Sequence, residues 1–117
     1  MTIHLSEKRC VACEGGTPAF TDAQIEEYKP QIEPAWQIRD DEGIKKLYRE
    51  FKFKDFKAAM EFVNAVAEIA ESEGHHPDLY IFYNLVKIEL YTHAVRGLFE
   101  NDFIIAAKID NILSKKV

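Results

Sequence analysis

Three of the chain's four histidines, His75, His76 and His93, fall within one short stretch of the sequence. Histidine is the side chain whose ordinary pKa lies near neutral pH, so it can donate and accept protons under physiological conditions. Side chains of this type, placed at the ends of helices and strands, can converge on one ligand. The spacing therefore predicts a pocket for proton transfer.

The first two of these histidines follow a predicted helix. Asp55 is a suitable N-cap, and apolar side chains then recur at three- and four-residue steps as far as residue 70. Gly74 suits the left-handed position that ends many helices, and Pro77 prevents the helix from continuing. His75 and His76 are therefore expected in the turn directly after the helix.

The end of that helix would influence the chemistry of His75. Backbone carbonyls at a helix C-terminus carry partial negative charge, which favours a protonated imidazolium nearby. Glu71 lies one helical turn before His75, so its carboxylate is expected to accept a ring N–H and fix the tautomer. His93 would reach the same ligand from the strand pair that follows.

Plainer interpretations of the same residues stay open. His75 could simply cap helix carbonyls in a polar turn, and His93 could be a surface residue at a strand end. A zinc site made from His75, His76 and His93 is a third alternative, although the sequence H-H-P lacks the common spacing of zinc ligands. Periodicity does not decide among these interpretations.

Alternating apolar and polar residues predict two antiparallel pairs of strands. The first pair spans residues 35–39 and 47–53 around a turn that is rich in acidic residues. The second pair spans residues 79–83 and 86–92. It follows the two adjacent histidines, and its outgoing strand is expected to finish near His93.

Two further helices complete the pattern. A capping box formed by Thr21 and Gln24 predicts the start of a short helix, which Pro30 ends near residue 29. Asn101 or Asp102 is expected to cap a last helix. The order of helix, two strands, helix, two strands and helix predicts an α+β fold, in which the helices cover one face of an antiparallel sheet.

The predicted middle helix carries more apolar surface than one sheet face would cover. Phe62 and Ile69 widen its apolar arc beyond the face that packs on the sheet. We therefore expect part of this helix to pack on another copy of the chain.

The length and composition set further limits. A chain of 117 residues is long enough for one compact domain, which we assign to residues 18–117 after a flexible N-terminal arm of residues 1–17. No apolar run approaches the roughly 20 residues of a membrane span, and the N-terminus lacks the pattern of a secretion signal. A cytoplasmic protein without membrane contact is therefore expected. The net charge of -5 argues against binding to nucleic acid.

The N-terminal arm contains a C-x-x-C pair, Cys10 and Cys13. Such a pair can be half of a zinc site or a redox motif. No second pair follows at the spacing of a zinc finger, and the glycines after Cys13 are typical of a loop. Two reduced thiols in a mobile arm are the favoured interpretation.

Several spaced motifs together resemble those of the pterin-4a-carbinolamine dehydratases, in the bacterial form of the family. The resemblance covers residues 18–113. The motifs are Glu71-x3-His75-His76-Pro77, Tyr83, His93 and Asp102, together with Phe51-x-Phe53-x-Asp55-Phe56 and Tyr83-Asn84-x-Val86-x-Ile88-x-Leu90. It implies a four-stranded antiparallel sheet with about three helices packed on one face, assembled as a homodimer or homotetramer.

The resemblance also implies an activity. Members of the family dehydrate 4a-hydroxytetrahydrobiopterin to quinonoid dihydropterin, which regenerates the pterin used by aromatic amino acid hydroxylases. The reaction needs no metal or other cofactor. A pterin substrate and a functional link to such a hydroxylase are therefore the partners that we expect.

The functional positions of the family map onto residues of this chain. The catalytic set is His75, His76 and His93, the substrate-binding set is His76, Pro77 and Tyr83, and the supporting set is Glu71 and Asp102. The resemblance implies that His75 and His93 protonate the departing hydroxyl from either face of the ring, because water leaves far more easily than hydroxide. His76 would bind and orient the pterin.

Two alternatives to the dehydratase stay open. One is a non-catalytic dimerisation module that uses the apolar face of the middle helix, and the other is a pterin-binding relative in molybdenum-cofactor metabolism. Members that also act as a dimerisation cofactor of a homeodomain transcription factor carry Cys and Arg where this chain has Val95 and Asn101. The resemblance therefore does not extend to that second role.

Overall fold

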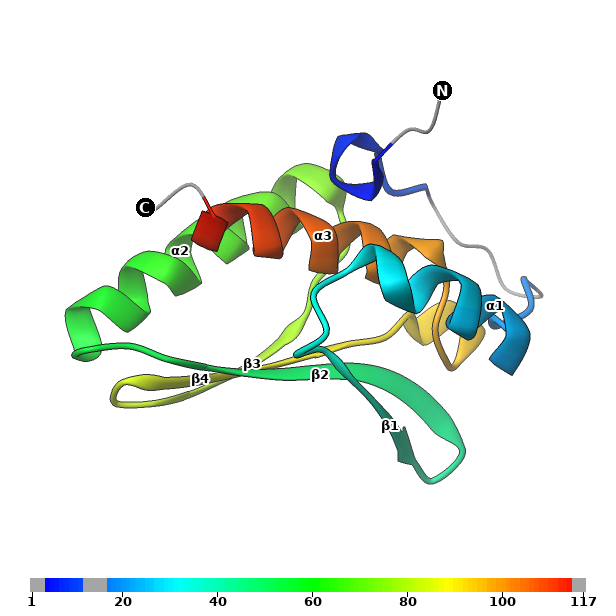
Figure 1. Ribbon diagram of the computed structural model, residues 1–117, viewed down its shortest axis with the longest axis horizontal. Helices are drawn as coiled ribbons and strands as arrows, with labels where there is room; N and C mark the ends of the chain where they lie inside the picture. Colours follow the sequence, from blue (N-terminus) through cyan, green and yellow to red (C-terminus); the bar gives the residue numbers. More distant parts are fainter. Residues whose placement is uncertain (1–3, 12–16, 115–117) are drawn as a thin grey trace.

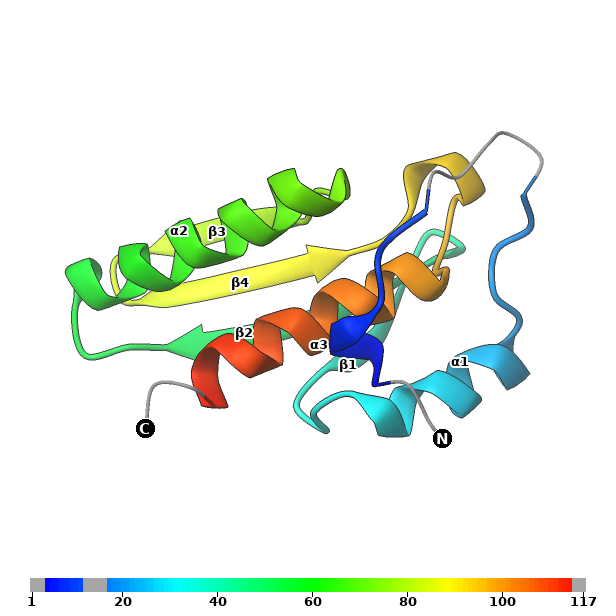
Figure 2. The ribbon, with the colours of Figure 1, turned by 90° about the horizontal axis from the view of Figure 1, so that it is seen from above.

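A four-stranded antiparallel sheet with three α-helices on one face forms the fold, as the sequence predicted (Figures 1 and 2). The computed structural model describes residues 4–11 and 17–114. The strands lie in the order β1-β2-β4-β3. The elements are the 3-10 helix η1 (Leu5–Glu7), α1 (Asp22–Tyr28), η2 (Lys29–Gln31), β1 (Gln37–Asp41), β2 (Ile44–Lys52), α2 (Phe56–Glu73), β3 (Asp78–Phe82), β4 (Leu85–Leu90), η3 (His93–Val95) and α3 (Glu100–Ser114).

The core lies between the two central strands and helices α2 and α3. On β2 and β4 the pairs Leu47↔Leu90 and Phe51↔Val86 place apolar side chains on the face that the helices cover. Burial of each large apolar side chain stabilises the fold by about 1.5–3 kcal/mol. Fully buried members of the core include Leu47, Phe62, Val66, Ile88, Leu90, Phe103, Ile105 and Ile109.

Phe62 belongs to this core rather than to a subunit contact. Its side chain is fully buried within the chain, with its ring centroid 4.7 Å from that of Phe51 and 5.1 Å from that of Phe53. The expectation that Phe62 widens an outer apolar face of α2 is therefore wrong. Its ring packs inside the chain, on Phe51 and Phe53, and α3 lies beside this helix.

The local signals that begin and end α1 and α2 are confirmed. Thr21 and Gln24 form the predicted capping box, and α1 ends at Tyr28. The Asp55 carboxylate accepts a hydrogen bond of 2.8 Å from the backbone N–H of Ala58, which caps α2. Gly74 follows the helix with φ +66°, a left-handed conformation that strains other residues. This turn directs His75 away from the helix axis.

Helix α3 begins differently from the prediction. Its first residue is Glu100, so neither Asn101 nor Asp102 is the N-cap. Instead, the Asp102 carboxylate reaches back and accepts a hydrogen bond of 3.0 Å from the backbone N–H of Phe99. A side chain in the first turn of a helix can accept a hydrogen bond from the backbone N–H of the residue before the helix, which is one half of a capping box.

Strand β4 ends at Leu90, before the predicted end of the strand. Thr92 then pairs with Gly97 in an isolated antiparallel bridge, and η3 lies between them. His93 is therefore the first residue of a short 3-10 turn rather than the last residue of a strand. The turn is tight because Arg96 adopts a positive φ of 55°.

The described part of the predicted N-terminal arm packs on the domain. Leu5 is buried, and the ammonium of Lys108 donates a hydrogen bond of 2.8 Å to the backbone carbonyl of Ser6. Residues 1–3 and 12–16, including Cys13, lie outside the described residues. Within residues 4–11 and 17–114, no helix is both long enough and apolar enough to cross a bilayer.

A candidate acid/base site

A hydrogen-bonded group joins His75, Asp102 and Thr92 at one end of the sheet. The His75 Nε2 and the Asp102 Oδ1 lie 2.7 Å apart. The Thr92 hydroxyl donates to Asp102 Oδ2 over 2.8 Å, in addition to the bond from the Phe99 backbone. The end of α2, the segment after β4 and the start of α3 therefore meet at one carboxylate.

The Asp102 carboxylate is fully buried and satisfied by these three partners. Its position in the first turn of α3 places the negative charge at the positive end of the helix dipole. Because the carboxylate is held in this way, it binds Nε2 of His75 and fixes the orientation of the ring. The ring nitrogen left for a ligand is Nδ1, which can exchange a proton while Nε2 stays bonded to Asp102.

The partner of His75 differs from the sequence prediction. Glu71 was expected to accept a hydrogen bond from His75, but its Oε1 lies 2.6 Å from Nε2 of His76. The left-handed turn at Gly74 moves His75 off the helical path on which Glu71 would face it. The Glu71–His76 pair is exposed, so its contribution to stability is small, about 0–1 kcal/mol.

A cavity of about 380 Å³ opens beside His75. This volume lies within the range of roughly 300–1,000 Å³ that is typical of small-molecule sites. The described residues that line it are Val11, Glu73, Gly74, His75, Thr92, Ala94 and Asn101. The hydroxyl, amide and carboxylate in this wall are engaged by other groups of the chain, so His75, whose Nδ1 is left for a ligand, is the candidate for proton transfer.

The other two histidines are not among the described residues that line this cavity. His76 follows His75 directly, and its side chain is exposed. His93 is exposed at the start of η3, where its ring centroid lies 4.2 Å from that of Tyr91. Its sequence neighbours Thr92 and Ala94 both line the cavity. The backbone of His93 therefore belongs to a segment that contributes to the cavity wall, whereas its ring contacts Tyr91.

Of the other two residues that were predicted to bind the substrate, Pro77 lies next to the site and Tyr83 does not. Pro77 is half-buried in the turn between His76 and β3, next to the site. Tyr83 lies in the β3–β4 turn, where its ring stacks on Phe56, the first residue of α2. The 18 residues of α2 span about 27 Å between Phe56 and the turn before His75. Within one chain, Tyr83 therefore does not reach the cavity as a substrate-binding residue.

Among the described lining residues, the sequence analysis placed His75 in the site and Gly74 at the end of the helix. It did not predict the other five, which are Val11, Glu73, Thr92, Ala94 and Asn101. Thr92 and Asn101 directly precede predicted site residues, which was the available signal. Val11 and Glu73 gave no signal, because no local pattern places the N-terminal segment against the end of α2.

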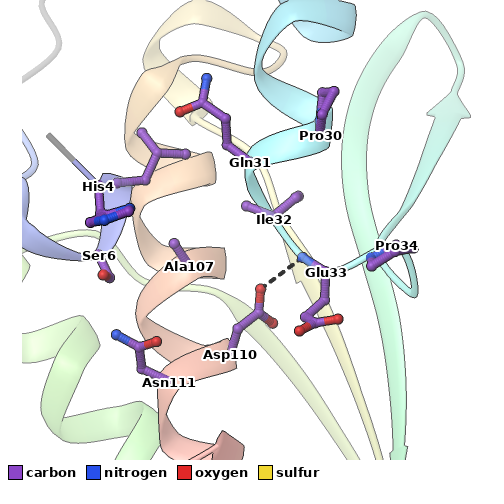
Figure 3. Close-up of a pocket in the computed structure, with 11 residues that line it drawn as sticks. His4, Ser6, Pro30, Gln31, Ile32, Glu33, Pro34, Ala107, Asp110 and Asn111 are labelled. Atoms are coloured by element: carbon purple, nitrogen blue, oxygen red, sulfur yellow. Dashed lines mark hydrogen bonds between the residues drawn. The ribbon is translucent and has the colours of Figure 1, made fainter. Parts of the chain in front are cut away.

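A second cavity, of about 340 Å³, lies between residues 30–34, the N-terminal segment and α3 (Figure 3). Its Asp110 carboxylate accepts hydrogen bonds from the backbone of Glu33, from Trp36 and from Arg49. Burial raises the pKa of Asp110 above its usual value, against the opposing effect of these donors. The carboxylate is committed to the fold, so this cavity is the weaker candidate for catalysis.

Metal ligation finds no support in the described part of the chain. Residues 4–11 and 17–114 contain no group of three or more His, Cys, Asp or Glu side chains arranged to hold a metal ion. The three histidines that suggested a zinc site engage Asp102, Glu71 and Tyr91 instead.

Comparison with known proteins identifies the family of this chain. Residues 18–112 match the family model described as "Pterin 4 alpha carbinolamine dehydratase". A relative from Legionella pneumophila (strain Corby) is 48% identical over 113 residues, which cover 97% of this chain and 98% of the relative. One from Alkaliphilus metalliredigens is 43% identical over 107 residues, covering 92% and 94%. Both carry the name "Putative pterin-4-alpha-carbinolamine dehydratase".

Two solved structures share the fold. The "transcriptional coactivator/pterin dehydratase" from Brucella melitensis has a TM-score of 0.72 and 34% identity, covering 80% of this chain and 97% of that one. A "pterin dehydratase-like protein" described as a RuBisCO assembly factor has a TM-score of 0.57 and 23% identity, covering 67% and 88%, and shows a likeness of fold alone. Since the family model and the relatives span nearly the whole chain, this chain belongs to the pterin-4-alpha-carbinolamine dehydratase family.

Proposed function

We propose that this chain dehydrates 4a-hydroxytetrahydrobiopterin to quinonoid dihydropterin by histidine acid/base catalysis. The observation that carries the proposal is the imidazole of His75, held by the buried Asp102 at the wall of a cavity of suitable size. Membership of the family supplies the substrate class. The position of His75 at the cavity wall supports its role as the proton donor.

In the proposed reaction the bond between C4a and its hydroxyl oxygen breaks. His75, protonated at Nδ1, donates that proton to the oxygen, which leaves as water. The pterin then loses the proton on N5, and a double bond forms between N5 and C4a. The N5 proton returns, through solvent or a second imidazole, to the base, so the catalyst is unchanged after one turnover. General acid/base catalysis of this kind contributes about 10²–10⁴-fold to a rate.

The other histidines have distinct proposed roles. His93 lies on η3 between two residues that line the cavity, which supports a role as the acid for a hydroxyl on the opposite face of the ring. His76 would bind and orient the pterin at the exposed rim, where Glu71 holds its ring. Asp102 would keep Nε2 of His75 protonated and stabilise the imidazolium form.

The cellular context belongs to the same proposal. Dehydration of the carbinolamine would return the pterin to an aromatic amino acid hydroxylase, in the cytoplasm, with the enzyme assembled as a homodimer or homotetramer. The exposed apolar residues of β3 and its following turn support self-association, because an exposed apolar patch of this kind favours contact with another protein surface. They are Tyr80, Ile81, Phe82 and Tyr83.

The test is a pair of histidine substitutions. Dehydration of synthetic 4a-hydroxytetrahydrobiopterin is measured for the wild type, for His75→Ala and for His75→Ala combined with His93→Ala. The proposal predicts a large loss in the single variant and the uncatalysed rate in the double variant, with circular dichroism and oligomer size unchanged. A double variant as fast as an active wild type would remove His75 and His93 from the mechanism, whereas a wild type no faster than the uncatalysed reaction would leave a non-catalytic dimerisation module as the better account.

A further inference from the structure

Residues 8–11, which we call the strap, run from η1 to the cavity beside His75. In Figure 2 this blue segment passes across α3 toward the turn at η3. Its last described residue, Val11, lines the cavity together with His75 and Thr92. The strap, which is far from His75 in the sequence, thus forms part of the candidate site.

Asn101 holds the strap at Val11 with both ends of its side-chain amide. Its Nδ2 donates to the Val11 carbonyl over 2.7 Å, and its Oδ1 accepts from the Val11 N–H over 3.0 Å. Asn101 is only 3% exposed. The amide therefore pairs with the backbone of Val11 as a neighbouring strand would, and fixes the position of that residue.

Glu73 provides the second anchor. Its Oε1 accepts a hydrogen bond of 2.8 Å from the Cys10 backbone N–H, and its Oε2 lies 3.1 Å from Nε of Arg9 and 3.7 Å from Nζ of Lys108. Burial raises the pKa of the Glu73 carboxyl, but the Cys10 N–H and the two cations outweigh it and hold the pKa below its usual value. Glu73 is therefore a buried, charged anchor at the end of α2.

The contacts that anchor the strap contribute little to the hydrophobic core. The Arg9 side chain is 74% exposed and Val11 is 58% exposed, so docking the strap buries little apolar surface there. The pairing does, however, fix an apolar side chain at a cavity whose other walls are largely polar. Among the described lining residues, Val11 and Ala94 are the two with apolar side chains. A flat heterocycle needs such surface beside its polar contacts.

We propose that the strap is a wall of the pterin pocket, and that Val11 contacts the bound ring and sets its affinity. Glu73 and Asn101 are the positioning residues that hold Val11 in place. This inference rests on the dehydratase function proposed above. It adds a binding residue outside the histidine motifs, together with the two side chains that position it.

The experiment compares Val11→Ser and Asn101→Ala with the control Glu7→Ala, an exposed residue of η1 that is not among the lining residues of the cavity. Val11→Ser removes the apolar side chain but keeps the backbone groups that Asn101 engages. The measurements are KM and kcat with the carbinolamine, and Kd for 7,8-dihydrobiopterin by calorimetry. We expect KM and Kd to rise about fivefold or more in both variants, with kcat changing by less than twofold, and wild-type constants in Glu7→Ala.

The outcomes separate this inference from the function beneath it. If the wild type is active and Val11→Ser has the same KM and Kd, the proposal that the strap forms a wall of the pocket is wrong, while the dehydratase proposal stands. A wild type that neither dehydrates the carbinolamine nor binds 7,8-dihydrobiopterin overturns both. If Asn101→Ala unfolds, Val11→Ser alone still decides the matter, because its substituted side chain is 58% exposed in the wild type and its replacement leaves the core intact.

Discussion

The imidazole of His75 and the carboxylate of Asp102 lie 27 residues apart in sequence and 2.7 Å apart in space. The carboxylate is fully buried, whereas the histidine lines a cavity. Through this contact the start of α3 determines the orientation of a side chain at the end of α2. The account of catalysis depends on that orientation.

Replacing Asp102 with Asn is expected to lower kcat by about 10²-fold, within the range that a general acid contributes. The amide can donate to His75 Nε2, which would keep that nitrogen unprotonated and remove the carboxylate that stabilises the proposed imidazolium acid. Steady-state kinetics with the carbinolamine measures the effect. Since a buried hydrogen-bond partner also changes, we expect the free energy of unfolding to fall by about 1–3 kcal/mol, as urea titration would show. A variant with wild-type kcat would remove Asp102 from the mechanism.

The exposed pair of His76 and Glu71 is expected to matter little for stability. A double-mutant cycle of His76→Ala and Glu71→Ala should give a coupling free energy of about 0–1 kcal/mol in urea unfolding. In kinetics, His76→Ala should raise KM more than it lowers kcat, because the proposed role is to orient the pterin. A fall in kcat as large as that of His75→Ala would instead make His76 a proton donor.

The charge of Glu73 is expected to stabilise the fold in a pH-dependent way. Its pKa in the folded protein is lowered from the ordinary 4.5. The stabilisation is therefore fully present above pH 4.5 and is lost as the pH falls through the lower pKa of the folded state. The free energy of unfolding of the wild type should exceed that of Glu73→Gln at pH 7, and the difference should shrink in acid. A difference that grows below pH 4 would contradict this assignment.

Self-association is expected to depend on the apolar edge of the sheet. Phe82 and Tyr83 are 57% and 64% exposed, on and beside the edge strand β3. Replacing Phe82 with Lys should shift the protein toward monomer in light-scattering measurements, because a charge in an apolar contact is costly. Glu26→Ala, an exposed position on α1, serves as a control. An oligomer that withstands Phe82→Lys would place the interface elsewhere.

The fold was largely predictable because its signals are local. The capping box at Thr21, the N-cap at Asp55 and the left-handed Gly74 each act within a few residues, and the structure contains all three. The candidate site was predictable only in part. Resemblance to the family suggested Asp102, but the contact that joins it to His75 is long-range, and the local rule of one helical turn selected Glu71 instead.

The N-terminal segment shows the same limit more clearly. Glu73 and Asn101 hold the backbone of Cys10 and Val11, and backbone partners leave no pattern in the sequence. Composition alone suggested a flexible arm for residues 1–17, yet the described residues 4–11 lie against α2 and α3. Contacts between a side chain and a distant backbone can be found only once the fold is known.

The central claim is that His75 transfers a proton to a pterin in the cavity next to it. A crystal structure with bound 7,8-dihydrobiopterin tests this most directly. We predict that the ring lies in the cavity lined by Val11, His75 and Thr92, with the C4a region within hydrogen-bonding reach of His75 Nδ1. A ring bound beside Asp110, or on the face of the sheet that the helices leave open, would contradict the claim.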